Sequence, residues 1–148
     1  VELFHKRKNK NIIHVTDKAM TRFSISLKES VELVLWSLKN SFGSEIFVPK
    51  IKSYKIMDLA KAFSEKARIN IIGIRSGEKI HEEMISCNES RYAFDLGKYY
   101  AILPDDKNKI HPFYKKYKKL KKNFSYQSNM NLFLTVEELR KLINEINK

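Results

Sequence analysis

The stretch INIIGIRSGEKI, residues 69–80, indicates both the fold class and the place where this chain binds a ligand. Four of its first six residues are isoleucine, and so short an apolar run is typical of a strand buried on both faces of a parallel sheet. Arg75, Gly77 and Glu78 follow directly, in a segment that has the composition of a turn. Ligands of open α/β sheets bind beyond the carboxyl ends of the strands, so we expect residues 75–78 to line a binding site.

The segments that precede this stretch alternate between helix and strand patterns. Residues 26–40 predict a helix, because apolar residues recur at helical spacing after an S-x-x-E capping box at 26–29. Residues 45–49 predict a strand closed by proline, and residues 55–67 predict a second helix. Together with the strand at 69–74, this alternation predicts an α/β fold.

The character of the chain changes after Pro104. A lysine-rich segment covers residues 107–122, and a terminal helix begins at a second capping box at 135–138. We therefore expect two parts, a binding lobe over residues 1–104 and a lysine-rich helical tail over residues 105–148.

Length and composition limit the class of protein. A chain of 148 residues, 43% of them hydrophobic, suffices for one domain with its own core. Its single cysteine, Cys87, excludes an internal disulfide and fits a reducing compartment. No apolar run approaches the roughly 18 residues that a membrane span needs. The chain opens at Val1 with a pattern resembling the middle of a helix, so we expect a fragment or a processed product.

The net charge of +12 favours anionic partners, nucleic acid among them. Basic residues gather at 5–11 and at 107–122, where interleaved tyrosines offer rings for stacking on bases. In the other interpretation, residues 107–122 form a solvated surface helix with Phe113, Tyr117 and Leu120 on its inner side. We favour the helix, because lysine clusters without arginine are weak evidence for specific recognition.

Arg75 and Glu78 suit a sugar nucleotide. A guanidinium group matches the oxygens of a diphosphate, and a carboxylate accepts hydrogen bonds from ribose hydroxyls. The alternative is that the two side chains form a structural ion pair.

A second candidate cluster lies before the first helix, where Thr16, Asp17, Thr21 and Arg22 occur within seven residues. Met20 and Phe23 flank the arginine, so we expect its stem in apolar surroundings and its guanidinium free for an anion. The alternative is a surface arginine on a loop.

No pattern supports a metal site or a nucleophilic catalyst. His81 opens an H-E-E-M sequence that lacks the second histidine of H-E-x-x-H. No pair of Cys87 and a histidine has a convincing third partner, and we interpret Cys87 as a core or semi-buried thiol.

Several long blocks resemble one family. They are TDKAMTRFSISLKESVELVL at 16–35, GSEIFVPKIKSYKIMDLAKAF at 43–63, IIGIRSGEKIHEEMIS at 71–86, YYAILP at 99–104 and FSYQSNMNLFLTVEELRKLI at 124–143. They resemble the C-terminal portion of inverting UDP-N-acetylglucosamine 4,6-dehydratases, which belong to the extended short-chain dehydrogenase/reductase superfamily. The resemblance implies the substrate-binding part of a Rossmann-type enzyme, without its N-terminal dinucleotide-binding half.

The resemblance also implies ligands and roles. Thr16, Arg75 and Glu78 match substrate-binding positions of the family, and Arg22 resembles an arginine directed at the diphosphate. The implied substrate is UDP-N-acetylglucosamine and the implied cofactor is NADP. The implied enzyme is a cytoplasmic homo-oligomer that serves surface polysaccharide or flagellin glycan synthesis on the pseudaminic acid side. The rivals are a 4-epimerase or retaining dehydratase of the same superfamily, or a basic binding module.

The sequence departs from the family pattern in two ways. Ser24, Lys52 and Ser76 replace a tryptophan and two prolines, and the lost prolines are expected to loosen two loops. The chain also lacks a glycine-rich cofactor turn, and its Tyr114–Lys118 pair lies in the lysine-rich segment, outside any matching block. We therefore assign no catalytic, cofactor-binding or metal residue, and expect the chain to be inactive alone.

Overall fold

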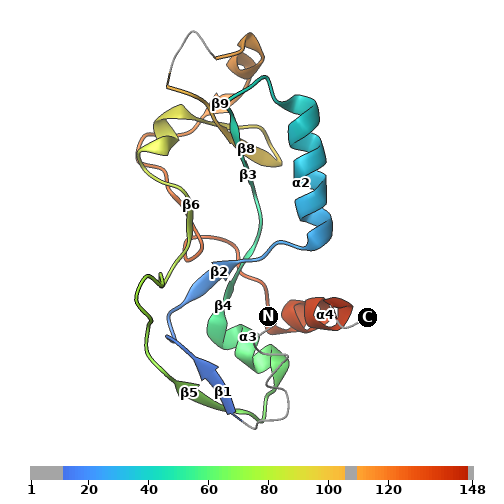
Figure 1. Cartoon of the computed structure of the whole chain (residues 1–148), viewed down its shortest axis with the longest axis vertical. Coiled ribbons are helices and arrows are strands. Elements are labelled where there is room, and N and C mark those ends of the chain that lie inside the picture. Colours follow the sequence, from blue (N-terminus) through green and yellow to red (C-terminus); the bar gives the residue numbers. More distant parts are fainter. Residues whose placement is uncertain (1–11, 106–109, 147–148) are drawn as a thin grey trace. The chain divides into compact units, whose positions relative to one another are not determined.

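The computed structural model describes residues 12–105 and 110–146, and Figure 1 shows its helices and strands. The chain forms two compact units that interleave along the sequence. The first unit contains residues up to 24, residues 52–82 and residues from 128 onward; the second contains residues 25–51 and 83–127.

The first unit combines a parallel strand pair, an antiparallel strand pair and two helices. Strands β1 (Ile12–Val15) and β5 (Arg68–Ile71) pair in parallel, with Val15 opposite Ile71. Strands β2 (Thr21–Phe23) and β4 (Ser53–Lys55) pair antiparallel.

The helices of the first unit are α3 (Ile56–Phe63) and α4 (Val136–Ile146). They pack together around three buried aliphatic side chains, Leu59, Leu139 and Ile143. Burying large apolar side chains of this kind is the main favourable term for such a core.

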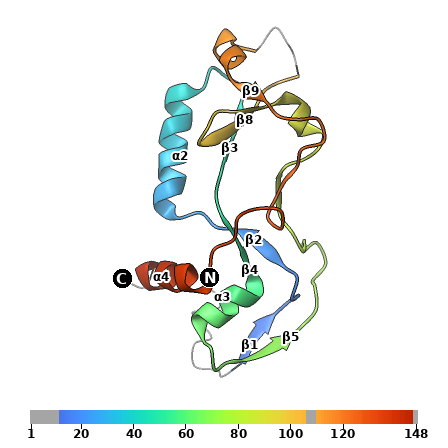
Figure 2. The same ribbon diagram turned by 180° about the vertical axis from the view of Figure 1, so that it is seen from behind.

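The second unit is built on an antiparallel sheet in the order β3-β8-β7-β9. Its strands are β3 (Ile46–Pro49), β8 (Tyr99–Ile102), β7 (Ala93–Asp95) and β9 (Lys118–Lys119). Helix α2 (Leu27–Asn40) lies along this sheet in both views (Figures 1 and 2).

The remaining elements of the second unit are short. Strands β6 (Glu83–Ile85) and β10 (Tyr126–Gln127) pair antiparallel. Two 3₁₀ helices are η1 (Glu89–Tyr92) and η3 (Pro112–Lys116).

Locally encoded elements follow the sequence predictions. The α/β fold class is confirmed, and so are the strand predicted at 45–49 and the helix after Ser26. The Ser26 hydroxyl accepts from the Glu29 amide at 3.2 Å, and the Glu29 carboxylate accepts from the Ser26 amide at 2.8 Å. The helix predicted over 55–67 is shorter and ends at Phe63.

The strand predicted at 69–74 is not buried on both faces. β5 ends at Ile71, and the side chains of Ile71, Ile72 and Ile74 are 40–45% exposed. Within the described residues β5 pairs with β1 alone, so a large part of the apolar surface of this segment stays accessible. The prediction of parallel pairing is correct and that of full burial is wrong.

The lysine-rich segment is not the long helix that we predicted. Over the described residues 110–122, η3 is followed by extended chain, and the Leu120 amide donates to the Ala93 carbonyl at 2.9 Å. Pro112 starts a new helical turn instead of continuing one, and pairing with β7 then holds the chain extended. Tyr114 is buried and donates to the Glu45 carboxylate at 3.1 Å, so its ring is not available to stack on bases.

Three further points concern the sequence predictions. The basic residues at 5–11 and at 107–109 lie outside the described part of the chain. The functional division between residues 104 and 105 stays a prediction. The two compact units divide the chain at other places, after residues 24, 51, 82 and 127. Among the residues that the structure describes, no helix is long and apolar enough to cross a membrane, and no histidine, cysteine, aspartate and glutamate cluster could hold a metal.

Candidate functional site

The predicted site residues all lie in the first compact unit. Thr16 follows β1 and the 75–78 turn follows β5. Because these strands are parallel and in register at their last residues, their carboxyl ends lie at one edge of the pair. The amide of Ile72 donates to the Val15 carbonyl at 2.9 Å and extends this contact past β5. The structure therefore brings Thr16 and the loop that contains Arg75 to the same edge.

The turn at 75–78 is held by its backbone and by one carboxylate. The Glu78 amide donates to the Arg75 carbonyl at 3.1 Å, and the Arg75 amide donates to Oε2 of Glu78 at 3.2 Å. Gly77 has a φ of 79°, a left-handed conformation that favours glycine. The closed turn holds the Glu78 carboxylate on the backbone amide of Arg75, whose residue is exposed.

The structural ion pair considered for Arg75 and Glu78 does not form. Within residues 12–105 and 110–146, no carboxylate forms an ion pair with the Arg75 guanidinium, and the Glu78 carboxylate binds a backbone amide instead. An exposed guanidinium offers a planar set of donors for a phosphate or a carboxylate. The turn therefore presents one available cation and one fixed anion.

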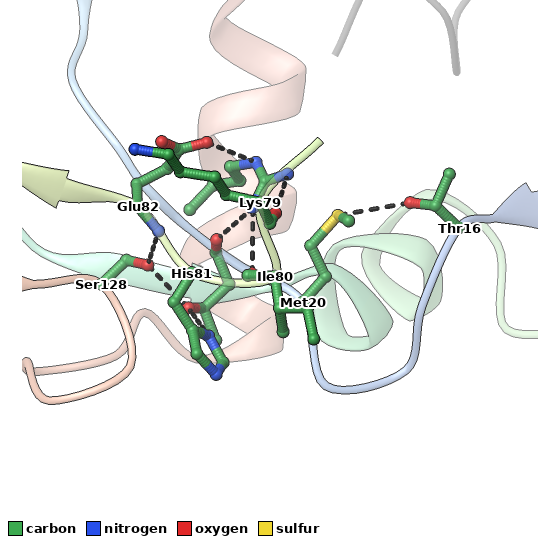
Figure 3. A network of polar contacts seen from close by, with 9 residues as sticks. Thr16, Met20, Lys79, Ile80, His81, Glu82 and Ser128 are labelled. Atoms are coloured by element: carbon green, nitrogen blue, oxygen red, sulfur yellow. Dashed lines mark hydrogen bonds and ion pairs between the residues drawn. The ribbon is translucent and has the colours of Figure 1, made fainter. Parts of the chain in front are cut away.

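Arg22 has a different environment. It lies on β2, and its guanidinium donates to the carbonyls of Thr21 at 2.7 Å, Lys79 at 2.9 Å and Ile80 at 3.1 Å. Nε also lies 3.3 Å from Oε1 of Glu82 (Figure 3). The expectation of a free guanidinium on Arg22 is wrong, because backbone carbonyls of the 79–80 segment occupy its donors. Its role in substrate binding stays a prediction.

A buried polar network lies next to Arg22. The Thr21 hydroxyl is 2.8 Å from Nδ1 of His81 and 2.7 Å from the Ser128 hydroxyl. The Ser128 hydroxyl also accepts from the Glu82 amide at 2.9 Å (Figure 3). The Ser128 amide donates to the Glu82 carbonyl at 2.8 Å. Thr21 and Ser128 are both buried. The network links three segments that are distant in the sequence: Thr21, residues 81–82 and Ser128.

This network could not be predicted from the sequence. Ser128 belongs to the F-x-Y-x-S-x-x-N block of the tail, which signalled family resemblance but no partner. Asn131 of the same block donates to the Ser53 hydroxyl at 3.0 Å. Ser128 and Asn131 of this block thus form hydrogen bonds that link segments within the first unit.

Two local contacts complete the geometry. The Thr16 hydroxyl donates to the sulfur of buried Met20 at 3.3 Å, which places it close to the turn that leads into β2. Tyr54 lies opposite Arg22 in the β2–β4 pair, and burial raises the pKa of its phenol while the Arg22 charge lowers it. Burial is the larger effect and the pKa is raised overall, so the phenol stays protonated at neutral pH.

Comparison with known proteins identifies the family. A family model described as "Polysaccharide biosynthesis protein" matches residues 1–104. The chain belongs to this polysaccharide biosynthesis family.

Individual relatives agree with this assignment. The chain is 44% identical over 138 residues to a UDP-N-acetylglucosamine 4,6-dehydratase (inverting) from Campylobacter jejuni, covering 88% of this chain and 41% of that protein. It is 38% identical over 143 residues to a UDP-glucose 4-epimerase from Rickettsia bellii, covering 93% of this chain and 42% of that protein. The resemblance to inverting dehydratases that we inferred from the sequence blocks is thereby confirmed.

A solved structure supports the fold. The X-ray structure of Pen from Bacillus thuringiensis superposes with a TM-score of 0.83 at 30% identity, over 99% of this chain and 45% of that chain. The chain thus spans less than half the length of these relatives.

Proposed function

We propose that this chain is the UDP-sugar-binding part of an NADP-dependent, inverting UDP-N-acetylglucosamine 4,6-dehydratase. The observation that carries the proposal is the 75–78 turn, where an exposed guanidinium without a carboxylate partner among the described residues lies at the carboxyl end of β5. This is the position at which α/β sheets bind nucleotides. The 44% identity to a dehydratase of that name supports the choice of sugar nucleotide.

Each proposed site residue has a distinct task. Arg75 pairs with the diphosphate, whose oxygens match the guanidinium geometry. Glu78 keeps one carboxylate oxygen on the Arg75 amide, and the other accepts hydrogen bonds from the ribose hydroxyls. Thr16 contributes a hydroxyl from the end of β1. The Arg22 guanidinium would have to give up one of its hydrogen bonds to backbone carbonyls before it could bind the diphosphate. We therefore assign it the weakest direct contact of the four residues.

The cofactor is not held by this chain. NADP binding requires a glycine-rich turn between a strand and a helix, and Gly43, Gly73, Gly77 and Gly97 form no such motif. In the proposed complete enzyme, NADP would accept hydride from the sugar and return it after loss of water. The residues of this chain then bind and orient the substrate, and we expect no turnover without the part that binds NADP.

The relatives also support a second function. The Rickettsia bellii protein is a UDP-glucose 4-epimerase, and its 38% identity extends over 93% of this chain. Both names describe enzymes of UDP-sugars, so the UDP contacts proposed for Arg75 and Glu78 are the same in either case. A comparison of UDP-N-acetylglucosamine with UDP-glucose as ligands separates the two.

The biological setting that we propose follows the family. The product would enter bacterial surface polysaccharide or flagellin glycan synthesis of the pseudaminic acid type. The complete enzyme would be a cytoplasmic homo-oligomer. Membership of the polysaccharide biosynthesis family supports the proposed role in glycan synthesis. The proposal of a cytoplasmic homo-oligomer rests on the resemblance to the superfamily.

Calorimetric titration with UDP-N-acetylglucosamine tests the proposal. We expect Arg75→Ala to weaken binding about 10- to 100-fold, since a hydrogen bond to a charged group contributes about 1.5–3 kcal/mol. Glu78→Ala should weaken binding less, and UDP alone should show the same order of effects. Arg91→Ala is the matched control, because Arg91 is another exposed arginine, in η1 of the second unit. Unchanged affinity in both site variants, with native circular dichroism, would contradict the assignment.

A further inference from the structure

Residues 115–122, with the sequence KKYKKLKK, form a strongly basic segment of the second unit. Six of these eight residues are lysine, none is acidic, and all six lysines are exposed. Asp95 lies opposite Lys118 in the β7–β9 pair, but its carboxylate already binds the Lys50 ammonium at 2.5 Å and the Gly97 amide at 2.8 Å. Among the residues that the structure describes, no carboxylate forms an ion pair with any of the six lysines.

The fold holds the backbone of this basic segment in place. Its first residues belong to η3, where the Tyr117 amide donates to the Tyr114 carbonyl at 3.1 Å, and β9 then pairs with β7. After β9, the Phe124 amide donates to the Lys121 carbonyl at 3.2 Å and closes a turn. Because the backbone is already fixed, only the lysine side chains have to lose freedom when an anionic partner binds.

Lysines on an edge strand can also serve only to prevent pairing with another chain. That reason accounts for Lys118 and Lys119, which form β9 at the end of the order β3-β8-β7-β9. It does not account for the four lysines of the segment that lie outside β9, namely Lys115, Lys116, Lys121 and Lys122. A cluster of this size creates a positive potential that attracts an extended anionic surface.

The side chains among the lysines disfavour a nucleic acid as that partner. The rings of Phe113 and Tyr117 lie 5.3 Å apart, and the Lys116 ammonium lies 4.2 Å and 5.1 Å from their centroids. Both rings are therefore engaged with neighbours and are poor platforms for stacking bases. The segment also contains no arginine, asparagine or glutamine, which are the residues that most often read base edges.

The same composition suits the surface of a lipid bilayer. Clusters of about four to eight basic residues bind anionic lipid head groups, and the lysine ammonium does so as a point charge without a fixed geometry. The long lysine stems, with half-buried Tyr117 and Leu120 between them, combine apolar and polar groups as the boundary of a bilayer does.

We propose that the basic segment docks this chain on a membrane surface that contains anionic phospholipids. Because the attraction is electrostatic, the docking is reversible and weakens as salt is added. It requires no sugar nucleotide, so the inference stands apart from the proposed function.

Co-sedimentation of the whole chain with vesicles tests this inference. The probe vesicles contain phosphatidylglycerol and phosphatidylcholine in about equal amounts, which makes their surface negative, and the reference vesicles contain phosphatidylcholine alone. We expect the chain to bind the probe vesicles and not the reference vesicles. Binding should be lost between about 0.1 M and about 1 M salt, where the Debye length falls from about 10 Å to about 3 Å.

Two triple variants separate the basic segment from net charge. Lys115→Gln/Lys121→Gln/Lys122→Gln removes three charges outside β9 and should weaken vesicle binding about 10- to 100-fold. The matched control changes three exposed lysines elsewhere that have no ion pair among the described residues, and it lowers the net charge equally. It is Lys28→Gln/Lys66→Gln/Lys141→Gln, and it should weaken binding less than about threefold. Circular dichroism and the melting temperature verify that both variants fold.

Three outcomes overturn the inference. The first is equal binding to the two kinds of vesicle, or binding to neither. The second is an equal loss of binding in the two triple variants, which would assign the attraction to net charge alone. The third is tighter binding to duplex DNA than to the probe vesicles at equal phosphate concentration, lost in the segment variant, which would make a nucleic acid the partner.

Discussion

Two arginines of the first unit, Arg22 and Arg75, occupy opposite kinds of environment. Arg22 is 20% exposed and donates to three backbone carbonyls, and its Nε lies beside the Glu82 carboxylate. Arg75 is exposed, and among the described residues no carboxylate pairs with its guanidinium. From sequence alone the two residues looked equally suited to bind an anion.

The difference shows that the fold uses one arginine to hold the backbone and leaves the donors of the other accessible. An arginine whose donors are satisfied by carbonyls fixes the backbone that carries those carbonyls, here residues 79 and 80. An arginine left exposed beside a rigid turn retains its donors for a ligand. Since Arg22 secures the residues that directly follow the 75–78 turn, it helps to hold that turn in position.

The first prediction concerns the buried network beside Arg22 and has the largest expected effect. Ser128→Ala changes the volume little but removes the hydroxyl that contacts Thr21 and accepts the Glu82 amide, leaving both without this partner. We expect the free energy of unfolding to fall by about 2–3 kcal/mol, measured by urea denaturation. Ser76→Ala, in the exposed turn, should change it by less than about 0.5 kcal/mol. Equal effects of the two variants would show that the network does not stabilise the unit.

The second prediction compares the two arginines directly. Arg22→Met keeps most of the aliphatic stem and removes the donors to the carbonyls of Lys79 and Ile80. We expect it to lower the free energy of unfolding by about 1–2 kcal/mol, whereas Arg75→Met should lower it by less than about 0.5 kcal/mol. For binding the order should be reversed: on folded protein, Arg75→Met should weaken UDP-N-acetylglucosamine affinity more than Arg22→Met does.

A further variant sharpens this comparison. Glu82→Gln removes the ion pair of Arg22 but leaves its three carbonyl bonds, and the Glu82 side chain is 42% exposed. Its effect should therefore be about 0.2–1 kcal/mol, smaller than that of Arg22→Met. If Glu82→Gln costs as much as Arg22→Met, then the ion pair and not the carbonyls anchors Arg22.

The third prediction has the smallest effect and concerns Lys52, where the family usually has proline. The Lys52 ammonium lies 2.7 Å from the Glu138 carboxylate of α4 and lowers the pKa of that carboxyl below its ordinary 4.5, with the Thr135 amide contributing. A lowered folded pKa means that the stabilisation is present above pH 4.5 and is lost as the pH falls through the folded value. NMR titration of Lys52→Met should show the Glu138 pKa moving up toward 4.5. No movement would mean that the capping contact alone lowers it.

The sequence determined the elements whose stabilising contacts are local. The capping box at Ser26 and Glu29 joins residues three apart, and the 75–78 turn closes through Arg75 and Glu78, also three apart. Such contacts depend on a few neighbouring residues, so residue type and spacing predict them. The family assignment rested likewise on ordered blocks of sequence, and the comparisons confirmed it.

The tertiary structure alone decided which polar groups are occupied. Arg22 meets the Ile80 carbonyl 58 residues along the chain, and Thr21 meets Ser128 across 107 residues. Likewise, pairing of Leu120 with Ala93 holds the lysine-rich segment extended where its local pattern favoured a helix. Contacts between distant segments depend on how the whole unit packs, and local periodicity carries no record of them. The sequence therefore sufficed to select candidate site residues, while the division between an anchored arginine and an available one required the fold.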